Sequence, residues 1–188
     1  MKKSIAILAA VLLFAFQSVD AQTVTSNGVK VQSTLTVGSQ KLDRIGSGVR
    51  KKYGMSMYVG TLYADKTKSK AALANANEPA AVSIHIVSSL ITSERMEESI
   101  REGFVLSTGG NTKTIDARIN QMIKVFSEPI KVGDVFDIKY SPTAGTQISK
   151  NGKLKVTIPG HDFKKALFNI WLGPKPVDAG LKKSMLAL

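Results

Sequence analysis

Apolar and polar residues alternate over much of the first half of the chain, and this pattern predicts β-strands. A period of two is expected where one face of a strand is buried and the other faces solvent. Two further regions of this kind, Leu42–Ala64 and Ala80–Ser89, follow, and glycines interrupt the first of them at positions 46, 48, 54 and 60. In the earliest region the alternating apolar residues are Val29, Val31, Leu35 and Val37.

Four later segments repeat their apolar residues every three or four positions, which predicts amphipathic helices. Thr92 or Ser93 is expected to cap the first helix, and Asp178 the last one. The third should end at Gly173, before Pro174. The apolar stripes are Met96, Ile100 and Phe104; Ile115, Ile119, Met122, Ile123 and Phe126; Phe163, Leu167, Ile170 and Trp171; and Leu181, Met185 and Leu186.

Between the second and third helices, three short alternating segments predict an antiparallel meander. These are residues 135–140, 146–150 and 153–158, and Asn151-Gly152 joins the last two with the pair that a type I′ turn prefers. Strands, two helices, strands again and further helices indicate the α+β class. We expect one large antiparallel sheet covered by a layer of helices, in the manner of an open-faced β-sandwich.

The first 21 residues differ in texture from the rest of the chain. Lys2 and Lys3 precede an apolar run from Ile5 to Phe16, and small residues lead to Ala21. This arrangement is typical of a secretory signal peptide, and the run is shorter than the roughly 20 residues of a membrane-spanning helix. We therefore predict a signal peptide over 1–21, one domain over 22–188 with no transmembrane segment, and a periplasmic or secreted location.

Composition narrows the chemistry that the domain can perform. The 188 residues include no cysteine and only two histidines, which excludes disulfide scaffolds, thiolate metal sites and a three-histidine metal centre. We expect no metal and no cofactor. The net charge of +12 is spread along the sequence without interleaved aromatic residues, so nucleic acid is not expected as a partner. Weak association with an anionic membrane surface stays open.

The segment from Gly46 to Asp65 carries the candidate site. If the chain reverses at Gly54, Arg50 lies opposite Tyr58, and Lys52 opposite Ser56, on one face of a hairpin. Glycines occupy much of that face, which predicts empty volume around the guanidinium and the phenol. Such a pair offers parallel charge-assisted donors and a third donor to a carboxylate or an enolate. The alternative interpretation is that Arg50 belongs to a solvated basic cluster and Tyr58 lies on the surface of the sheet.

Several segments together resemble the chalcone isomerase-like family over nearly the whole of 22–188. The resemblance implies that family's sheet and helices, with a ligand cleft between them. The family contains isomerases that close a chalcone into a flavanone and non-catalytic members that bind fatty acids. The matching segments are Gly48–Lys52, Tyr58–Asp65, Glu94–Phe104, Gly133–Thr146, Asn151-Gly152 and Ala166–Gly173.

Within that resemblance, Arg50 matches an arginine that both groups use, and Tyr58 matches the fatty-acid-binding members. Thr92 and Ser99 stand at the helix positions where isomerases carry a tyrosine and an asparagine, and Leu181 replaces a hydroxyl residue of the isomerase cleft. We therefore expect a non-enzymatic binder of a fatty acid or similar apolar carboxylate, with Arg50, Tyr58, Thr92 and Ser99 as ligand-binding residues. The alternative is an isomerase-type intramolecular lyase acting on a small phenolic or enone compound.

Two histidines complete the candidate residues. His85 alternates with apolar neighbours and is interpreted as a strand-surface residue, with a place in the cleft as the alternative. His161 precedes Asp162 at the start of a predicted helix, where we expect Asp162 to act as the cap and not as the partner of a catalytic histidine.

Overall fold

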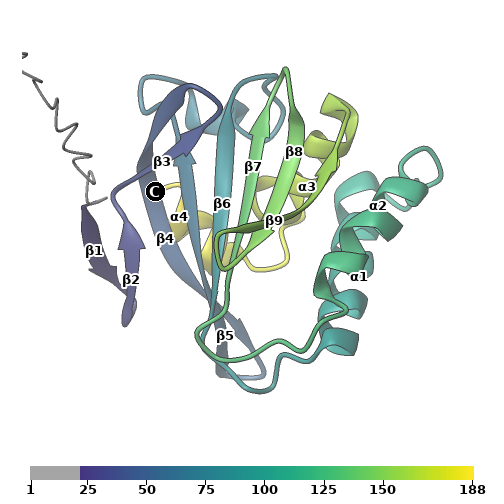
Figure 1. Ribbon diagram of the computed structural model, residues 1–188, viewed down its shortest axis with the longest axis horizontal. Helices are drawn as coiled ribbons and strands as arrows, with labels where there is room; N and C mark the ends of the chain where they lie inside the picture. The colour runs from purple at the N-terminus through teal and green to yellow at the C-terminus, as the bar shows by residue number, and fades with distance from the viewer. Residues whose placement is uncertain (1–21) are drawn as a thin grey trace, which may run out of the picture.

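A curled antiparallel sheet forms the centre of the molecule in the computed structural model, which describes residues 22–188 (Figure 1). The predicted signal peptide lies outside the described residues. Each strand of the sheet pairs with its neighbours in the sequence. The seven strands within 22–188 are β3 (Thr34–Val37), β4 (Gln40–Lys52), β5 (Met55–Ala64), β6 (Ala80–Ile86), β7 (Val135–Ser141), β8 (Gly145–Lys150) and β9 (Lys153–Ile158). This is the α+β architecture that the sequence predicts.

Helices cover one face of this sheet. Phe104, on the stripe predicted for the first helix, is completely buried, and the Thr92 hydroxyl accepts a hydrogen bond from the Arg95 amide as the expected cap. Asp178 likewise caps the last helix by accepting from the Leu181 amide, at 2.9 Å. Within 22–188 the helices are α1 (Ser93–Thr108), α2 (Asp116–Ile123), α3 (His161–Leu172) and α4 (Ala179–Met185), with 3₁₀ turns η1 (Lys70–Ala72) and η2 (Lys124–Phe126).

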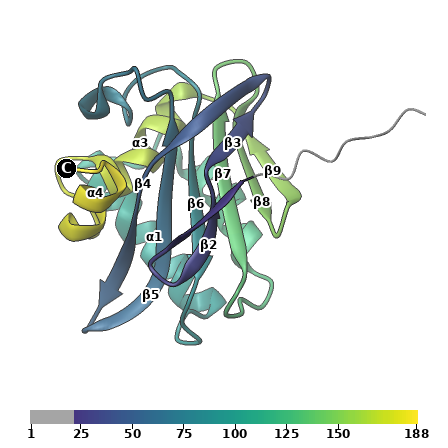
Figure 2. The ribbon, with the colours of Figure 1, turned by 90° about the vertical axis from the view of Figure 1, so that its left-hand side faces the viewer.

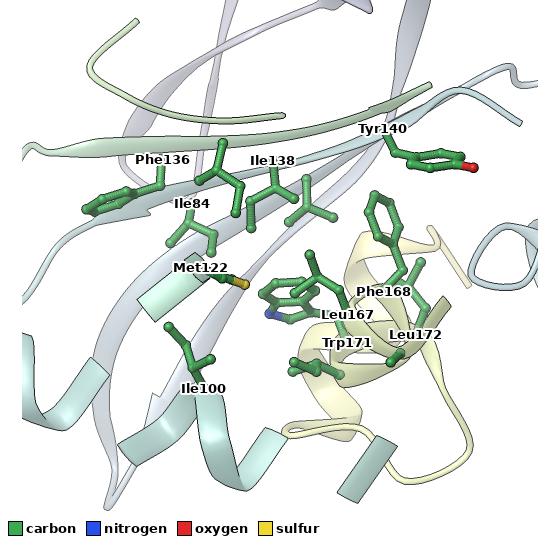
Figure 3. Packing of buried hydrophobic residues seen from close by; sticks show 14 of the residues in the cluster. Ile84, Ile100, Met122, Phe136, Ile138, Tyr140, Leu167, Phe168, Trp171 and Leu172 are labelled. Atoms are coloured by element: carbon green, nitrogen blue, oxygen red, sulfur yellow. The ribbon is translucent and has the colours of Figure 1, made fainter. Parts of the chain in front are cut away.

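The hydrophobic core lies between the sheet and α1, α2 and α3. Figure 3 shows the Trp171 ring of α3 among side chains from three sides: Ile84 from the sheet, Ile100 from α1 and Met122 from α2. The alternating pattern of β6 and the helical stripes therefore meet in one cluster, which is what orients α1 and α3 toward the sheet.

The other face of the sheet carries a small second layer. The hairpin of β1 (Thr23–Ser26) and β2 (Val29–Gln32) crosses this face (Figure 2), where the Tyr63 hydroxyl donates to the Gln32 carbonyl at 3.0 Å. The single strand expected over Val29–Val37 is thus two strands in different sheets. The reason lies at Ser33, whose amide donates to Gln22 while its carbonyl accepts from Arg44 of β4, so that the pairing changes partners there.

Helix α4 packs directly on the glycines of the β4–β5 hairpin. A Cβ atom added at Gly48 would stand 2.6 Å from Ser184 Cβ, and one added at Gly46 would stand 2.8 Å from the Met185 carbonyl oxygen. The empty volume predicted beside these glycines is therefore occupied by the chain itself. Of the four glycines expected to interrupt this region, only Gly54 separates two strands.

Candidate functional site

A cavity of about 590 Å³ lies between the sheet and the helices. Its inner wall is apolar and comes from β6, α1, α2 and α3, with Ile84, Ile100, Met122 and Trp171 pointing toward one another (Figure 3). Its charged lining residues are Arg50, Lys52, Arg95, Glu98 and Glu102. Known small-molecule sites span roughly 300–1,000 Å³ and combine an apolar lining with a few polar groups. The volume and lining suit a ligand with one polar end.

The β4–β5 hairpin brings Arg50 and Tyr58 together. The two residues are direct partners in the strand pairing, as predicted, and both side chains line the cavity. The predicted pairing of Lys52 with Ser56 is wrong, because the turn contains only two residues and Lys52 pairs with Met55. A bulge between Arg50 and Lys51 then adds the residue that restores the predicted register at Arg50.

The Tyr58 hydroxyl group is held neutral and oriented. Its oxygen accepts a hydrogen bond from Trp171 Nε1 at 2.9 Å. Desolvation raises the pKa of Tyr58 to about 12, although the Trp171 hydrogen bond and the charge of Arg50 act in the opposite direction. Within residues 22–188 the hydroxyl donates no hydrogen bond, so its proton can be donated to a ligand in the cavity.

The Arg50 guanidinium is paired with a carboxylate from α4. Its Nη1 lies 3.4 Å from Asp178 Oδ2 and also donates to the Lys51 carbonyl. Desolvation alone would raise the pKa of Asp178, but hydrogen bonds from the Leu181 and Lys51 amides and the charge of Arg50 place it below its usual range. Asp178 is therefore ionised at neutral pH and occupies part of the donor set that a ligand carboxylate would use.

A family model described as chalcone isomerase-like matches residues 23–187. The chain belongs to the chalcone isomerase-like family. Among solved structures, a fatty-acid binding protein of Arabidopsis thaliana has a similar fold, with a TM-score of 0.68, 14% identity and coverage of 88% of this chain and 96% of that one. At this identity the likeness concerns the fold. The search of curated proteins found no match.

Thr92 and Ser99 are the two residues at and within α1 that the sequence matches to donors of the isomerases. Ser99 lines the cavity, whereas Thr92 does not line it and uses its hydroxyl to cap α1. The Thr92 hydroxyl is thus engaged at the helix end and is not part of the cavity lining. The ligand-binding roles of Arg50, Tyr58, Thr92 and Ser99 stay predictions. Leu181 is buried on α4 against Gly48 and Gly60, not in the cavity lining.

Two other sequence candidates lie outside the cavity of this chalcone isomerase-like domain. His85 Nε2 lies 3.3 Å from the Ser83 hydroxyl, which donates to Asp137 at 2.6 Å; desolvation lowers the pKa of His85. Asp162 is not the cap of α3, because Gly160 holds that position; its carboxylate forms a two-oxygen ion pair with Arg118.

The sequence does not reveal the hydrogen-bond partners of Arg50 and Tyr58. The sequence pattern assigns Trp171 only to a core stripe and Asp178 only to a helix cap, yet they contact Tyr58 and Arg50 across 113 and 128 residues of sequence. Trp171 is the single tryptophan, but this fact does not indicate which residue it contacts. Long-range contacts of this kind require knowledge of how α3 and α4 return to the hairpin.

Over residues 22–188 there is no group of three or more His, Asp or Glu side chains placed to hold a metal ion. The helices described for this chalcone isomerase-like chain are too short or too polar to cross a membrane.

Proposed function

We propose that this protein is an exported binder of a fatty acid or a similar apolar carboxylate. One observation carries the proposal: Arg50 and Tyr58, a cationic donor and a neutral phenolic donor, line the same otherwise mainly apolar cavity. The chain belongs to the chalcone isomerase-like family, and the similar fold of a plant fatty-acid binding protein supports this class of ligand.

The donors at the hairpin suit a carboxylate head group. A guanidinium presents parallel N–H donors, and the Tyr58 hydroxyl still has its proton to donate. Charge-assisted hydrogen bonds of this kind contribute roughly 1.5–3 kcal/mol each in protein interiors. The ligand competes with Asp178 for part of this donor set, since Asp178 Oδ2 lies 3.4 Å from Arg50 Nη1.

The inner wall suits the acyl chain. Met96, Ile100, Phe126, Leu167 and Ile170 provide apolar surface along the cavity, and each methylene group removed from water contributes about 0.8 kcal/mol. Part of this gain is offset by the entropy that an acyl chain loses when it is held in one place. An acid with a long tail should therefore bind more tightly than a short one until the cavity is full.

Ring closure of an enone is the other activity that the family resemblance raises. Of the two helix positions that match isomerase donors, Ser99 lines the cavity and Thr92 does not. Loss of one oriented donor from a site that stabilises an oxyanion costs about 10²–10³ in rate. The departures at α1 thus favour a binding role over catalysis.

Trp171 provides a direct test of binding. It is the single tryptophan of the chain, it lines the cavity, and its Nε1 lies 2.9 Å from the Tyr58 hydroxyl oxygen. Stearic acids brominated near the carboxyl end or near the methyl end should both quench its fluorescence. If the head group rests between Arg50 and Tyr58, bromines near the carboxyl end should quench more strongly. Absence of quenching by either acid, together with no heat of binding in calorimetry, would overturn the proposal.

Two variants with the same change in net charge separate head-group recognition from general electrostatics. Arg50→Ala should weaken binding about 10- to 150-fold, following from the loss of roughly 1.5–3 kcal/mol. Lys51→Ala removes an exposed lysine that does not line the cavity and should leave the affinity nearly unchanged. Equal effects of the two variants would contradict the assignment. Turnover of a chalcone panel that depends on Arg50 would favour the isomerase instead.

The location of the protein is a second part of the proposal. A signal peptide over 1–21 places the mature chain in the periplasm or the medium. Cell fractionation and mass spectrometry of the purified protein test this: a mature N-terminus at Gln22 in an extracytoplasmic fraction is expected, and an intact Met1 in the cytoplasm would contradict it.

A further inference from the structure

Four large apolar side chains are exposed around the opening of the cavity. They come from three different parts of the chain: the tip of the β4–β5 hairpin, the segment between β6 and α1, and the last half of α1. All four also line the cavity, so the exposed apolar surface continues into its interior. We call this set the apolar rim: Tyr53, Met55, Leu90 and Leu106, with exposed fractions of 84%, 45%, 37% and 46%.

Tyr53 occupies a backbone conformation that does not suit it. At the Tyr53-Gly54 turn, Tyr53 has φ of 54°, in the left-handed region. Two other two-residue turns, Asn27-Gly28 and Asn151-Gly152, place asparagine at the same position with φ of 50° and 51°. Asparagine tolerates this region far better than a bulky aromatic residue does. An aromatic side chain is therefore held at the hairpin tip at a local conformational cost, and almost fully in solvent.

Basic residues accompany the apolar rim. Lys51 is exposed, and Lys52 lies with its ammonium 5.6 Å from the centre of the Tyr53 ring. Arg95 lines the opening on the α1 side, where its guanidinium donates to the Leu90 carbonyl. Glu98 and Glu102 also line the cavity, so the excess positive charge is concentrated at the hairpin tip. Long basic side chains beside an aromatic tip are typical of surfaces that meet the interfacial region of a membrane.

We propose that the apolar rim docks on a lipid bilayer that carries anionic head groups, with Tyr53 and Met55 entering the interface and Lys51 and Lys52 contacting the head groups. The cavity opening would then face the lipid directly. This use for loading or release of an acid rests on the proposed function, whereas the docking itself rests on the rim and its charges.

A bilayer fits the rim better than a protein partner or a second copy of the chain. The four side chains come from three separate parts of the chain and also line the cavity, so a folded protein bound to them would cover part of the cavity lining. Lipid tails can fill the space between separate protruding side chains, and anionic head groups complement the hairpin lysines. The aromatic ring at the tip, apolar with one polar end, also matches the interface.

Flotation of the mature protein with vesicles tests the proposal. We expect binding to vesicles of equimolar phosphatidylglycerol and phosphatidylcholine, little binding to phosphatidylcholine alone, and partial release by salt. Changing Lys51 and Lys52 together to Gln should weaken binding roughly 20- to 30-fold, since each basic residue near such a surface contributes about fivefold. Equal binding to both vesicle types, or no effect of the double variant, would overturn the proposal.

A substitution at the hairpin tip separates docking from folding. Tyr53→Asn introduces the residue that the other two turns use, so the variant should be at least as stable as the parent while it binds vesicles several-fold less. Leu154→Ser is the matched control, because Leu154 is 54% exposed on β9 and does not line the cavity; vesicle binding should not change. If Tyr53→Asn binds vesicles like the parent, the rim is not the docking surface.

Two further measurements distinguish the proposals. Quenching of Trp171 by dibrominated stearic acid in vesicle-free solution should be the same for Lys51→Gln and the parent, because Lys51 is exposed and does not line the cavity. Docking that persists when the acid fails to bind would refute only the proposed function. Light scattering after size exclusion should show a monomer. A dimer that Tyr53→Asn dissociates would assign the rim to a second copy and overturn docking on lipid.

Discussion

Replacing Gly46 by alanine should separate α4 from the β4–β5 hairpin. A Cβ atom at this position would stand 2.8 Å from the Met185 carbonyl oxygen and would also overlap the Ser184 carbonyl. Both obstacles are backbone atoms, so no change of rotamer can relieve them. Gly46 itself lies within β4 at a φ that any residue adopts, and the strain therefore comes from the contact with α4 alone.

The size of the effect can be bounded from the structure. Inserting a methyl group into a packed interface typically costs 1–3 kcal/mol, and a backbone obstacle places Gly46→Ala at the upper end or above it. The limit is complete release of α4, which would expose Leu181, Met185 and Leu186 at about 1.5–3 kcal/mol each. We expect a decrease of about 3 kcal/mol or more in the free energy of unfolding.

Gly60→Ala is the matched control on the neighbouring strand. There the added Cβ would meet side-chain atoms only, with Met185 Sδ at 3.3 Å and a Leu181 methyl carbon at 3.4 Å, and these flexible ends can adjust. Urea unfolding followed by circular dichroism should show Gly60→Ala within about 1 kcal/mol of the parent. Equal stability of Gly46→Ala and the parent, or equal losses in both variants, would refute the packing argument.

Further predictions concern Lys164, Tyr58 and Asp178. Burial lowers the pKa of Lys164 to about 8 in the folded protein, where its ammonium donates to three backbone carbonyls. Because the unfolded chain binds the proton more tightly, the free energy of unfolding should rise by about 2–3 kcal/mol between pH 8 and 10. The variant Lys164→Met should not show this rise. Above pH 10 the free energy of unfolding should fall again, because Tyr58, whose pKa is raised to about 12, keeps its proton in the fold; a flat profile in urea titrations would contradict both signs. Tyr58→Phe leaves the buried Trp171 Nε1 without its acceptor and should cost about 1–3 kcal/mol of stability together with a loss of acid binding, so an unchanged Trp171 emission spectrum would count against it. Asp178→Asn keeps a good helix cap but removes the charge that competes for Arg50, and should tighten acid binding in calorimetry with less than about 1 kcal/mol change in stability; weaker binding would contradict this.

Local sequence patterns account for most of the secondary structure. The stripe Met96, Ile100 and Phe104 and the Asn151-Gly152 turn were placed correctly because their signals depend only on near neighbours. The pairing of Arg50 with Tyr58 was also predictable, since a short hairpin fixes its own register to within the bulge that follows Arg50.

The surroundings of the site could not be predicted in the same way. A face lined with Gly46, Gly48 and Gly60 is compatible with an open cleft or with close approach of another element, and the sequence does not distinguish the two. The outcome depends on α4, which lies more than a hundred residues later in the chain. The hydrogen bond from Trp171 to Tyr58 is equally distant in sequence.

The strand order has a consequence for how the chain folds. Because each strand from β3 to β8 pairs with the next strand in the sequence, most of the sheet can grow by successive local closures, a low-contact-order route for a β-rich domain. The exception is the closure of β6 on β7, which spans residues 87–134 with α1 and α2. The packing of α4 on β4 is different, because it brings together segments that are more than a hundred residues apart. This contact therefore has the largest loop-closure cost and should form late. Refolding should therefore proceed in two kinetic phases, in which α4 docks on the sheet in the slower one. Under native conditions α4 should also be the first element to detach.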